Sequence, residues 1–317
     1  MAINIIESPI INIDTRAGGS PIPFINEIRN IWTGYRICYY KDVDWVDALP
    51  FKLADLDDES KWDVVEKKLF ALRDAYVDDA VKCVTKQIAF ALKYGYACNS
   101  IHIDPEKDLK TVTKEDIAAS AKKRFDSVID IIRNRDTIED KNMVSAAIAS
   151  IHVTNACKHV APKLKMGHES PFEHGVITYM LKYVSRSFTH QLVRCRLASY
   201  SQASQRYISE DPDNLSFVIP RAIREDPEAL KDVSDYLEGL SPLIKKLKAR
   251  GIKNEDIRCV FPNAMPTDIQ TTMNFRELKH LIDLRVDSHA QDEIRHVSFD
   301  LWTVMCNTMP FLWNTED

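Results

Sequence analysis

Glycine is scarce in this chain, with only eight among 317 residues. No Gly-x-Gly-x-x-Gly run and no Walker loop can be written from them. Rossmann and P-loop proteins use such glycine-rich turns to hold phosphates against the backbone. The sequence therefore argues against both fold types. If the protein binds a dinucleotide, side chains must hold its phosphates.

Paired cysteines are also missing. The cysteines are odd in number and scattered, and none forms a Cys-x-x-Cys pair, which argues against a disulfide framework and a structural zinc site. We expect most of them to be buried thiols in a reducing compartment. They are Cys38, Cys83, Cys98, Cys157, Cys195, Cys259 and Cys306.

A basic leader and long apolar runs are absent as well. Residues 1–14 contain Glu7 and Asp14 but no Lys or Arg, unlike the start of a signal peptide. No apolar run approaches the length of a membrane span. The net charge of -5 argues against a general nucleic-acid binder, which is normally basic. We therefore expect a cytoplasmic protein with neither membrane nor nucleic acid as partner.

The composition that remains is that of an ordinary globular protein, with 45% hydrophobic and 28% charged residues. Ser60 is expected to cap a helix that begins near residue 62. Asp287 or Ser288 is expected to cap a last helix, which reaches Met305. Apolar spacing predicts helices over residues 24–40, 62–96 (as one or two helices), 113–132, 143–165, 185–194, 227–250 and 254–260, and strands over 3–13, 175–184 and 215–219.

The strongest candidate for a functional site is the segment from Gln191 to Tyr207, which contains three arginines among hydroxyl and amide side chains. A guanidinium presents five donors in a fixed fork, which suits phosphates and the planar edges of bases. Arginines alone are often only a solvated face. Here, however, the order of the residues carries more information.

That order resembles the motif Arg-His-Arg-x-x-Ser-x-Asn-x-x-Ser-x-Arg-Tyr of flavin-dependent thymidylate synthases. Six of the eight fixed positions match in one unbroken run. The chain departs from the motif at Cys195, where the family has His, and at Ser201, where many members have Asn. The matching residues are Arg194, Arg196, Ser199, Ser204, Arg206 and Tyr207.

Three further patches are similar to the same family. Residues 167–174 resemble its Gly-His-x-Ser-x-x-Glu-His turn, which touches the flavin, and residues 258–262 resemble its Arg-x-x-x-Pro element. Residues 274–291 resemble its Asn-x-Arg…Leu-Arg-x-Asp-x-His-Ala-Gln segment. The two histidines and a glutamate of 167–174 could instead suggest a metal site. No further ligand group stands nearby and the later arginines would repel a cation, so no metal is expected.

The resemblance implies an α+β fold, an antiparallel sheet flanked by helices. It also implies reductive methylation of dUMP to dTMP, with FAD as cofactor and with methylenetetrahydrofolate and NADPH as co-substrates. Family members are homotetramers whose sites combine residues from several subunits. The alternatives are a related one-carbon transfer to a pyrimidine nucleotide, such as hydroxymethylation, or a non-catalytic relative that binds nucleic acid.

The resemblance also implies residue roles. Arg285 is the expected catalytic residue, because a cation beside the pyrimidine would stabilise negative charge as it develops on the ring. The expected dUMP-binding residues are Gln191, Arg194, Gln202, Ala203, Ser204, Gln205, Arg206, Arg258 and Arg285. The expected FAD-binding residues are Ser170, Arg194, Cys195, Arg196, Gln202, Asn274, Arg276 and His280.

Cys195 admits two interpretations. A thiol does little of the donating and stacking that an imidazole can do against a flavin, and the flanking arginines should make it more reactive. Cys195 then signals an altered flavin or folate site, with an outcome such as hydroxymethylation. The other interpretation is a tolerated exchange, since the remaining contacts persist.

The resemblance disappears over about residues 41–142, which we interpret as a helical insertion in a single domain of residues 1–317. The insertion could serve interaction or capping, or it could be additional scaffold.

Overall fold

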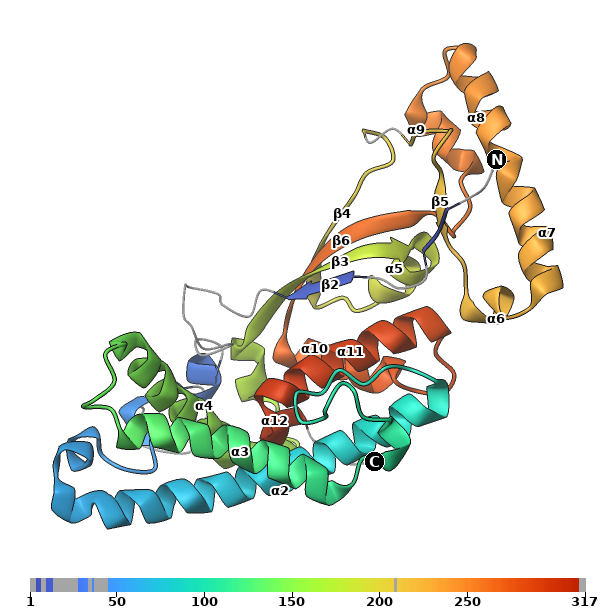
Figure 1. Ribbon diagram of the computed structural model, residues 1–317. Helices are drawn as coiled ribbons and strands as arrows, with labels where there is room; N and C mark the ends of the chain where they lie inside the picture. Colours follow the sequence, from blue (N-terminus) through green and yellow to red (C-terminus); the bar gives the residue numbers. More distant parts are fainter. Residues whose placement is uncertain are drawn as a thin grey trace. The chain divides into compact units, whose positions relative to one another are not determined.

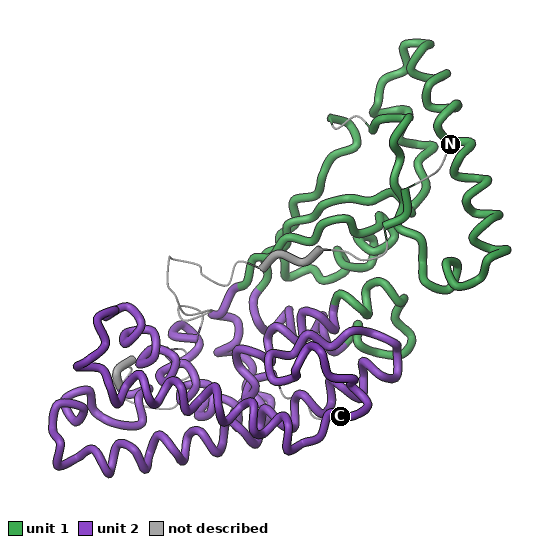
Figure 2. Tube along the Cα trace, viewed as in Figure 1, with its two compact units in different colours: residues 1–14, 177–273, 284–297 green, residues 15–176, 274–283, 298–317 purple. Residues whose placement is uncertain are grey.

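The computed structural model describes residues 4–6, 10–13, 28–33, 36, 45–207 and 210–313 (Figure 1). The chain divides into two compact units, which Figure 2 colours separately. Unit 1 comprises Met1–Asp14, Ile177–Met273 and Leu284–Val297, and unit 2 comprises Thr15–Val176, Asn274–Asp283 and Ser298–Asp317.

A four-stranded sheet forms the centre of unit 1. Its strands are β2 (Ile10–Ile13), β3 (Val176–Ser185), β4 (Ala198–Gln202) and β6 (Pro266–Asn274), in the order β2-β3-β6-β4. β2 runs antiparallel to β3, and β4 runs antiparallel to β6, with Ser199 opposite Thr272. Ile177, Tyr179 and Leu181 alternate along β3 and are buried, as expected of a strand with one face in a core. The expected strand at 175–184 is therefore confirmed.

A second core of unit 1 forms around a short parallel pair, β1 (Asn4–Ile6) with β5 (Ser216–Val218). It contains Phe217, Leu237 and Ile244. The helices that follow β5 are α6 (Arg221–Arg224), α7 (Pro227–Glu238), α8 (Leu240–Ala249) and α9 (Asn254–Ile257), continued by the 3-10 turn η7 (Arg258–Val260).

The prediction of one helix over 227–250 is wrong, because α7 and α8 are separate. Pro242 lies in the first turn of α8. It has no N–H to donate to the carbonyl group of Glu238, and its ring clashes with that carbonyl group. The chain therefore breaks at Gly239.

Unit 2 is mainly helical, and three long helices supply most of it: α2 (Trp62–Tyr94), α3 (Lys114–Arg133) and α4 (Lys141–Lys165). Its main core includes Leu69 and Leu72 of α2, Phe125 and Ile129 of α3, and Ile151 of α4. Unit 2 also contains the short helices η2 (Trp45–Ala48), η3 (Leu53–Asp57), η4 (Glu59–Lys61), η5 (Leu109–Thr111), η6 (Ser170–His174) and α12 (Pro310–Trp313).

Two longer helices each contribute residues to both units. They are α10 (Phe275–Arg285) and α11 (Asp292–Thr308). The helix expected to reach Met305 is α11. It begins later than expected, so neither Asp287 nor Ser288 caps it. The Asp287 carboxylate instead accepts the backbone N–H of His289 at 2.8 Å, in the turn between the two helices.

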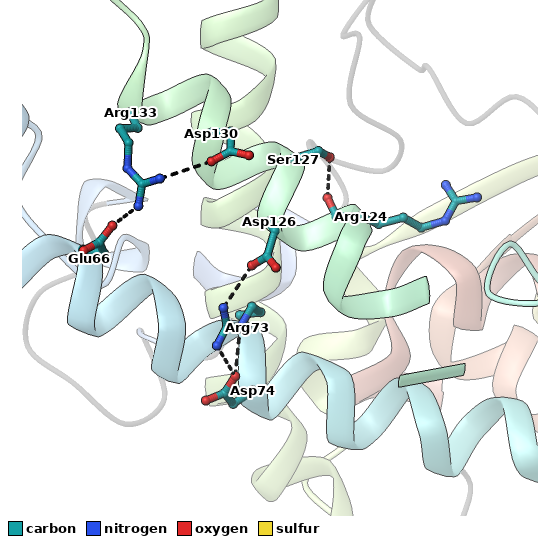
Figure 3. Close-up of polar contacts among 8 residues, drawn as sticks. All are labelled: Glu66, Arg73, Asp74, Arg124, Asp126, Ser127, Asp130 and Arg133. Atoms are coloured by element: carbon teal, nitrogen blue, oxygen red, sulfur yellow. Dashed lines mark hydrogen bonds and ion pairs between the residues drawn. The ribbon is translucent and has the colours of Figure 1, made fainter. Parts of the chain in front are cut away.

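Ion pairs join α2 to α3 on the surface of unit 2 (Figure 3). Arg73 of α2 lies 3.0 Å from the carboxylate of Asp126 on α3, and Arg133 of α3 contacts Glu66 of α2. These pairs show that the two helices run antiparallel. Individually, partly exposed pairs of this kind contribute about 0–1 kcal/mol each.

α3 is capped at the residue where a helix was expected to begin, whereas the cap expected for α2 is not found. Thr113 caps α3, since its hydroxyl accepts the N–H of Asp116 at 3.2 Å and the Asp116 carboxylate accepts the N–H of Thr113 at 2.8 Å. Ser60 does not cap α2. Ser60 lies inside η4, where it donates its N–H to the carboxylate of Asp58 at 3.1 Å.

A disulfide joins Cys83 of α2 to Cys306 of α11, with their Cα atoms 6.6 Å apart. This pair differs from the thiols expected from the sequence. The two cysteines are 223 residues apart, so no local spacing could indicate the pair. Cys157 and Cys195 are buried thiols as expected, whereas Cys259 is exposed.

The antiparallel sheet and its surrounding helices confirm the predicted α+β class. Within the described chain, no helix is long and apolar enough to cross a membrane. Residues 28–33 are helical, and most of the rest of the predicted helix at 24–40 lies outside the described residues. Residues 45–142 carry α2, α3 and the start of α4. That they are an insertion stays a prediction.

Candidate active site

Helix α5 (Arg186–Leu192) leads from the sheet into the arginine segment. Ser185 caps it by accepting the N–H of Phe188 at 2.9 Å. The Ser185 hydroxyl donates to the Glu293 carboxylate at 2.5 Å. Phe188 and Leu192 are buried, as predicted, and they anchor the helix in the core of unit 1. The helix is therefore fixed at its start and along one face.

The backbone carbonyl oxygen of Gln191 receives two hydrogen bonds at the end of this helix. Arg285 donates Nη2–H to it at 3.0 Å, and the backbone N–H of Arg194 lies 3.4 Å away. The Gln191 side chain donates to the Oε1 atom of Gln291 at 2.5 Å. The segment at 191–207 and the matching patch at 274–291 thus meet within unit 1.

The turn at 194–196 presents its two arginines outward and its cysteine inward. Arg194 and Arg196 are exposed, and within the described chain neither side chain has a hydrogen bond or an ion pair. Cys195 is only 3% exposed. The Tyr200 hydroxyl lies 2.6 Å from the carbonyl oxygen of Cys195 and holds the turn in place. The thiol is thus shielded, while two guanidinium groups remain available to an anion.

β4 carries the segment onward, and the backbone of Ala203 is fixed from both sides. Its N–H donates to the carbonyl oxygen of Asp268 at 2.9 Å, and its carbonyl oxygen accepts Nη2–H of Arg186 at 2.7 Å. Gln202 donates to the Thr189 hydroxyl at 3.1 Å. Ser204 and Gln205 follow in a half-buried turn. These contacts position the part of the segment expected to hold dUMP.

Arg206 and Arg258 meet at Glu255. Arg206 pairs with the Glu255 carboxylate at 3.4 Å, and Arg258 donates Nε–H to the Glu255 backbone carbonyl oxygen at 3.1 Å. Both arginines are exposed. Two patches that are far apart in the sequence therefore place guanidinium groups around one residue.

Arg186 belongs to this group of cations, although the family motif does not include it. It is half-buried, and its Nε atom is buried with no partner among the described residues. Burial lowers the pKa of Arg186, Glu210 opposes that effect, and the like charge of Arg258 adds to it. Burial in turn raises the pKa of Glu210. The sequence signal for Arg186 was weak, a single charge at the start of a short helix.

The remaining predicted FAD residues lie in unit 2. Ser170 begins η6 and is exposed. Asn274 accepts the N–H of Glu277 at 2.8 Å and so caps α10, which carries Arg276 and His280. Arg276 pairs with Glu173 and, at 3.2 Å, with Glu169. Glu173 is the main cause of the raised pKa of Arg276.

Gly175 allows the start of α10 to approach the end of the His168–His174 turn. A Cβ atom on Gly175 would lie 2.7 Å from Ile31 and 3.1 Å from Phe275. The Gly175 carbonyl oxygen accepts the N–H of Phe275 at 2.9 Å. Among the described residues, no group of three or more His, Cys, Asp or Glu side chains could hold a metal ion.

Comparison with known proteins identifies the family of the chain. The model of the family described as "Thymidylate synthase complementing protein" matches residues 108–311. The chain belongs to this family. The match contains every predicted site residue and begins inside the segment interpreted as an insertion.

Curated proteins named flavin-dependent thymidylate synthases are similar to this chain in sequence. The chain is 46% identical over 145 residues to "Flavin-dependent thymidylate synthase" from Thermococcus kodakarensis, which covers 45% of this chain and 59% of that protein. It is 44% identical over 146 residues to the protein of the same name from Pyrococcus furiosus, covering 45% and 60%. The chain thus spans about three fifths of the length of these relatives. The predicted resemblance to flavin-dependent thymidylate synthases is confirmed.

One of the solved structures that match is similar over half of the chain. It is a UMP/dUMP methylase, PolB, from Streptomyces cacaoi, with a TM-score of 0.46 and 22% sequence identity. The similarity covers 50% of this chain and 80% of that one.

Proposed function

We propose that the chain methylates dUMP to dTMP, with methylenetetrahydrofolate as carbon donor, NADPH as reductant and FAD as cofactor. The observation that carries the proposal is the meeting of arginines from separate parts of unit 1. The guanidinium of Arg285 donates to the carbonyl oxygen of Gln191, three residues before Arg194, and Arg206 and Arg258 both contact Glu255. An enzyme for a nucleotide monophosphate needs such a set of forked donors.

The phosphate of dUMP is assigned to Arg206, Ser204 and Arg258. The Ser204 hydroxyl already accepts the backbone N–H of Arg206 at 3.3 Å, so the turn fixes this hydroxyl beside the backbone of Arg206. Arg186 is added to this set. Its half-buried charge faces Arg258, and an anion between the two would relieve their repulsion.

The pyrimidine is assigned to Arg285. Carbon 5 of uracil is a poor nucleophile until electron density is pushed into the ring. A guanidinium beside N3 and the carbonyl oxygens stabilises the negative charge that develops there. The bond to Gln191 fixes one Nη atom of Arg285, and its buried Nε has no partner among the described residues. Arg285 is therefore held in place with a donor still available.

The side chains present suit FAD, which supplies the hydride when it is bound. Arg194 and Arg196 are exposed and have no partner within the described chain, so they can meet a pyrophosphate without first breaking an ion pair. Gln202, Ser170, Asn274 and His280 offer neutral or polar contacts. Arg276 would have to share its charge with Glu169 and Glu173.

The proposal also covers the oligomeric state, the cellular location and the role of residues 41–142. The exposed arginines of one chain suit a homotetramer in which subunits share sites. A cytoplasmic location follows for an enzyme of nucleotide biosynthesis. Residues 41–142 are proposed to be a helical insertion in one domain that spans the chain.

The test uses the purified full chain. We expect flavin absorbance and NADPH oxidation that depends on dUMP and methylenetetrahydrofolate, with dTMP identified by mass. The Arg285→Ala variant should retain flavin and lose turnover. A colourless protein that takes up no FAD and binds DNA with a steep salt dependence would reject the proposal in favour of nucleic-acid binding.

A further inference from the structure

Unit 2 contains a cavity of about 350 Å³ that shares no residue with the predicted dUMP and FAD sites. It lies among α2, α3, α4 and the end of α11, together with the loop after α2. A cavity of this size lies within the range that holds small organic ligands. Its lining residues are Tyr76, Ile101, Arg124, Phe125, Val128, Ser150, Val153, Thr154, Asn307 and Thr308.

The walls combine apolar side chains with a few polar groups. Ile101, Val128 and Val153 are aliphatic, and the rings of Tyr76 and Phe125 lie 5.5 Å apart between centroids. Flat aromatic bodies bind well against such rings, in offset or edge-to-face geometry. Mainly apolar walls with few polar groups are typical of specific small-molecule sites.

Arg124 supplies a charge that nothing nearby balances. Arg73 of α2 and Arg133 of α3 are paired with carboxylates, whereas the side chain of Arg124 extends away from these pairs (Figure 3). Within the described part of the chain, no carboxylate pairs with the Arg124 guanidinium. Burial is the main cause of the pKa shifts of Tyr76 and His102, and the charge of Arg124 opposes the rise at Tyr76 and adds to the fall at His102.

Tyr76 supplies a second donor. Its hydroxyl lies 3.2 Å from Nε2 of His102, and burial raises the pKa of Tyr76 to about 12. Burial lowers the pKa of His102 to about 4, so the imidazole is neutral near pH 7. Nδ1 of His102 is buried without a partner among the described residues.

A buried N–H without a partner is rarer than a buried acceptor without one. The His102 proton is therefore assigned to Nε2, which donates it to the Tyr76 oxygen. The hydroxyl hydrogen of Tyr76 is then left for a ligand in the cavity.

We propose that this cavity binds a small aromatic carboxylate, with the ring against Phe125 and Tyr76 and the carboxylate on Arg124 and the Tyr76 hydroxyl. One uncompensated guanidinium matches one carboxylate and can bind it through two parallel hydrogen bonds. A phosphate dianion would leave one charge unbalanced in a half-apolar site. The proposal does not depend on the dUMP chemistry of unit 1.

The probes are 1-naphthylacetate and its neutral amide, 1-naphthylacetamide, measured by calorimetry or ligand-observed NMR with the full chain. Hydrogen bonds to charged groups contribute about 1.5–3 kcal/mol. The carboxylate should therefore bind at least about tenfold more tightly than the amide. Arg124→Ala should remove this difference and leave amide binding unchanged, and Tyr76→Phe should weaken the carboxylate severalfold.

Lys122→Ala is the matched control, because two residues turn the helix by about 200° and place Lys122 on the other side of α3. It should bind both probes as the parent chain does. Saturating dUMP should leave the affinity for 1-naphthylacetate unchanged, which separates this cavity from the arginines of unit 1. Arg124 is exposed, so its loss is not expected to unfold the chain.

Any of four results would overturn the proposal. The parent chain could bind neither probe, it could bind both equally, or Arg124→Ala could bind the carboxylate as tightly as the parent. Competition by dUMP would also refute it, by assigning the probe to unit 1.

Discussion

Arg285 donates Nη2–H to the backbone carbonyl oxygen of Gln191 at 3.0 Å, although the two residues are 94 positions apart. The bond connects the end of α10 to the end of α5. It fixes the guanidinium from one side, and the rest of its donor fork is left for a substrate.

Arg285→Lys tests this arrangement. Lysine keeps the charge but cannot both hold the Gln191 carbonyl group and stabilise the pyrimidine. We expect kcat/KM for dUMP to fall by about 100-fold or more, with little change in melting temperature. Arg250→Lys, an exposed arginine at the end of α8, is the control and should be fully active. Full activity of Arg285→Lys would show that Arg285 does not stabilise the reacting ring.

Arg186→Gln tests the cation that the motif did not include. If Arg186 contacts the phosphate, its loss removes a charge-assisted bond, and dUMP affinity should fall by about tenfold or more. Calorimetric titration with dUMP measures this directly. Arg186→Lys should recover part of the loss. An unchanged dissociation constant for Arg186→Gln would confine Arg186 to its structural bond with Ala203.

Glu210→Gln should have the opposite effect. The carboxylate of Glu210 lies close enough to Arg186 to affect its pKa, and so it competes with an incoming anion. Removal of its charge should tighten dUMP binding by about two- to fivefold, the range for a partly exposed charge pair. The same titration decides the point, and weaker binding would contradict it.

Cys195→His restores the residue of the family motif. Position 195 is 3% exposed, so the larger imidazole should lower the free energy of unfolding by about 1–3 kcal/mol. Urea unfolding measures this cost, and flavin titration and product mass are measured in parallel. If flavin affinity and the dTMP product are unchanged, the interpretation of Cys195 as the mark of an altered outcome is removed.

Asp300 makes stability depend on pH. Burial raises its pKa to about 7 from an ordinary value of 3.8. Between these two pH values the Asp300 carboxyl is protonated in the folded chain but ionised in the unfolded chain. Its contribution is fully present below about pH 4 and is lost as pH rises to about 7. Relative to the parent, Asp300→Asn should gain about 1.4 kcal/mol per pH unit across that window. Urea unfolding at several pH values measures the difference, and a constant difference would contradict the assignment.

The sequence predicted most elements whose apolar spacing or cap is local. The helical segments at 62–96, which forms a single helix, and at 113–132 and the strand at 175–184 are confirmed. It missed the break at Gly239, since the spacing of apolar residues continues through Pro242 and outweighed that proline. It also missed the disulfide, which depends on how α2 meets α11 in space.

For the candidate site, the motif gave residues but no contacts. That the Arg285 guanidinium reaches the Gln191 carbonyl group depends on tertiary structure, which spacing does not contain. Arg186 was missed because one arginine at the start of a helix is usually solvated, and only its burial shows otherwise. The roles assigned to these residues stay predictions.

The ion pairs between α2 and α3 also govern how the two helices align. Glu66 and Arg73 are seven residues apart on one helix, and Asp126 and Arg133 are seven apart on the other. If one helix slid by two turns, about 10.5 Å, Glu66 would face Asp126 in one direction and Arg73 would face Arg133 in the other. Both shifted alignments set like charges against each other. Pairs that contribute little to stability can thus still select a single register during folding.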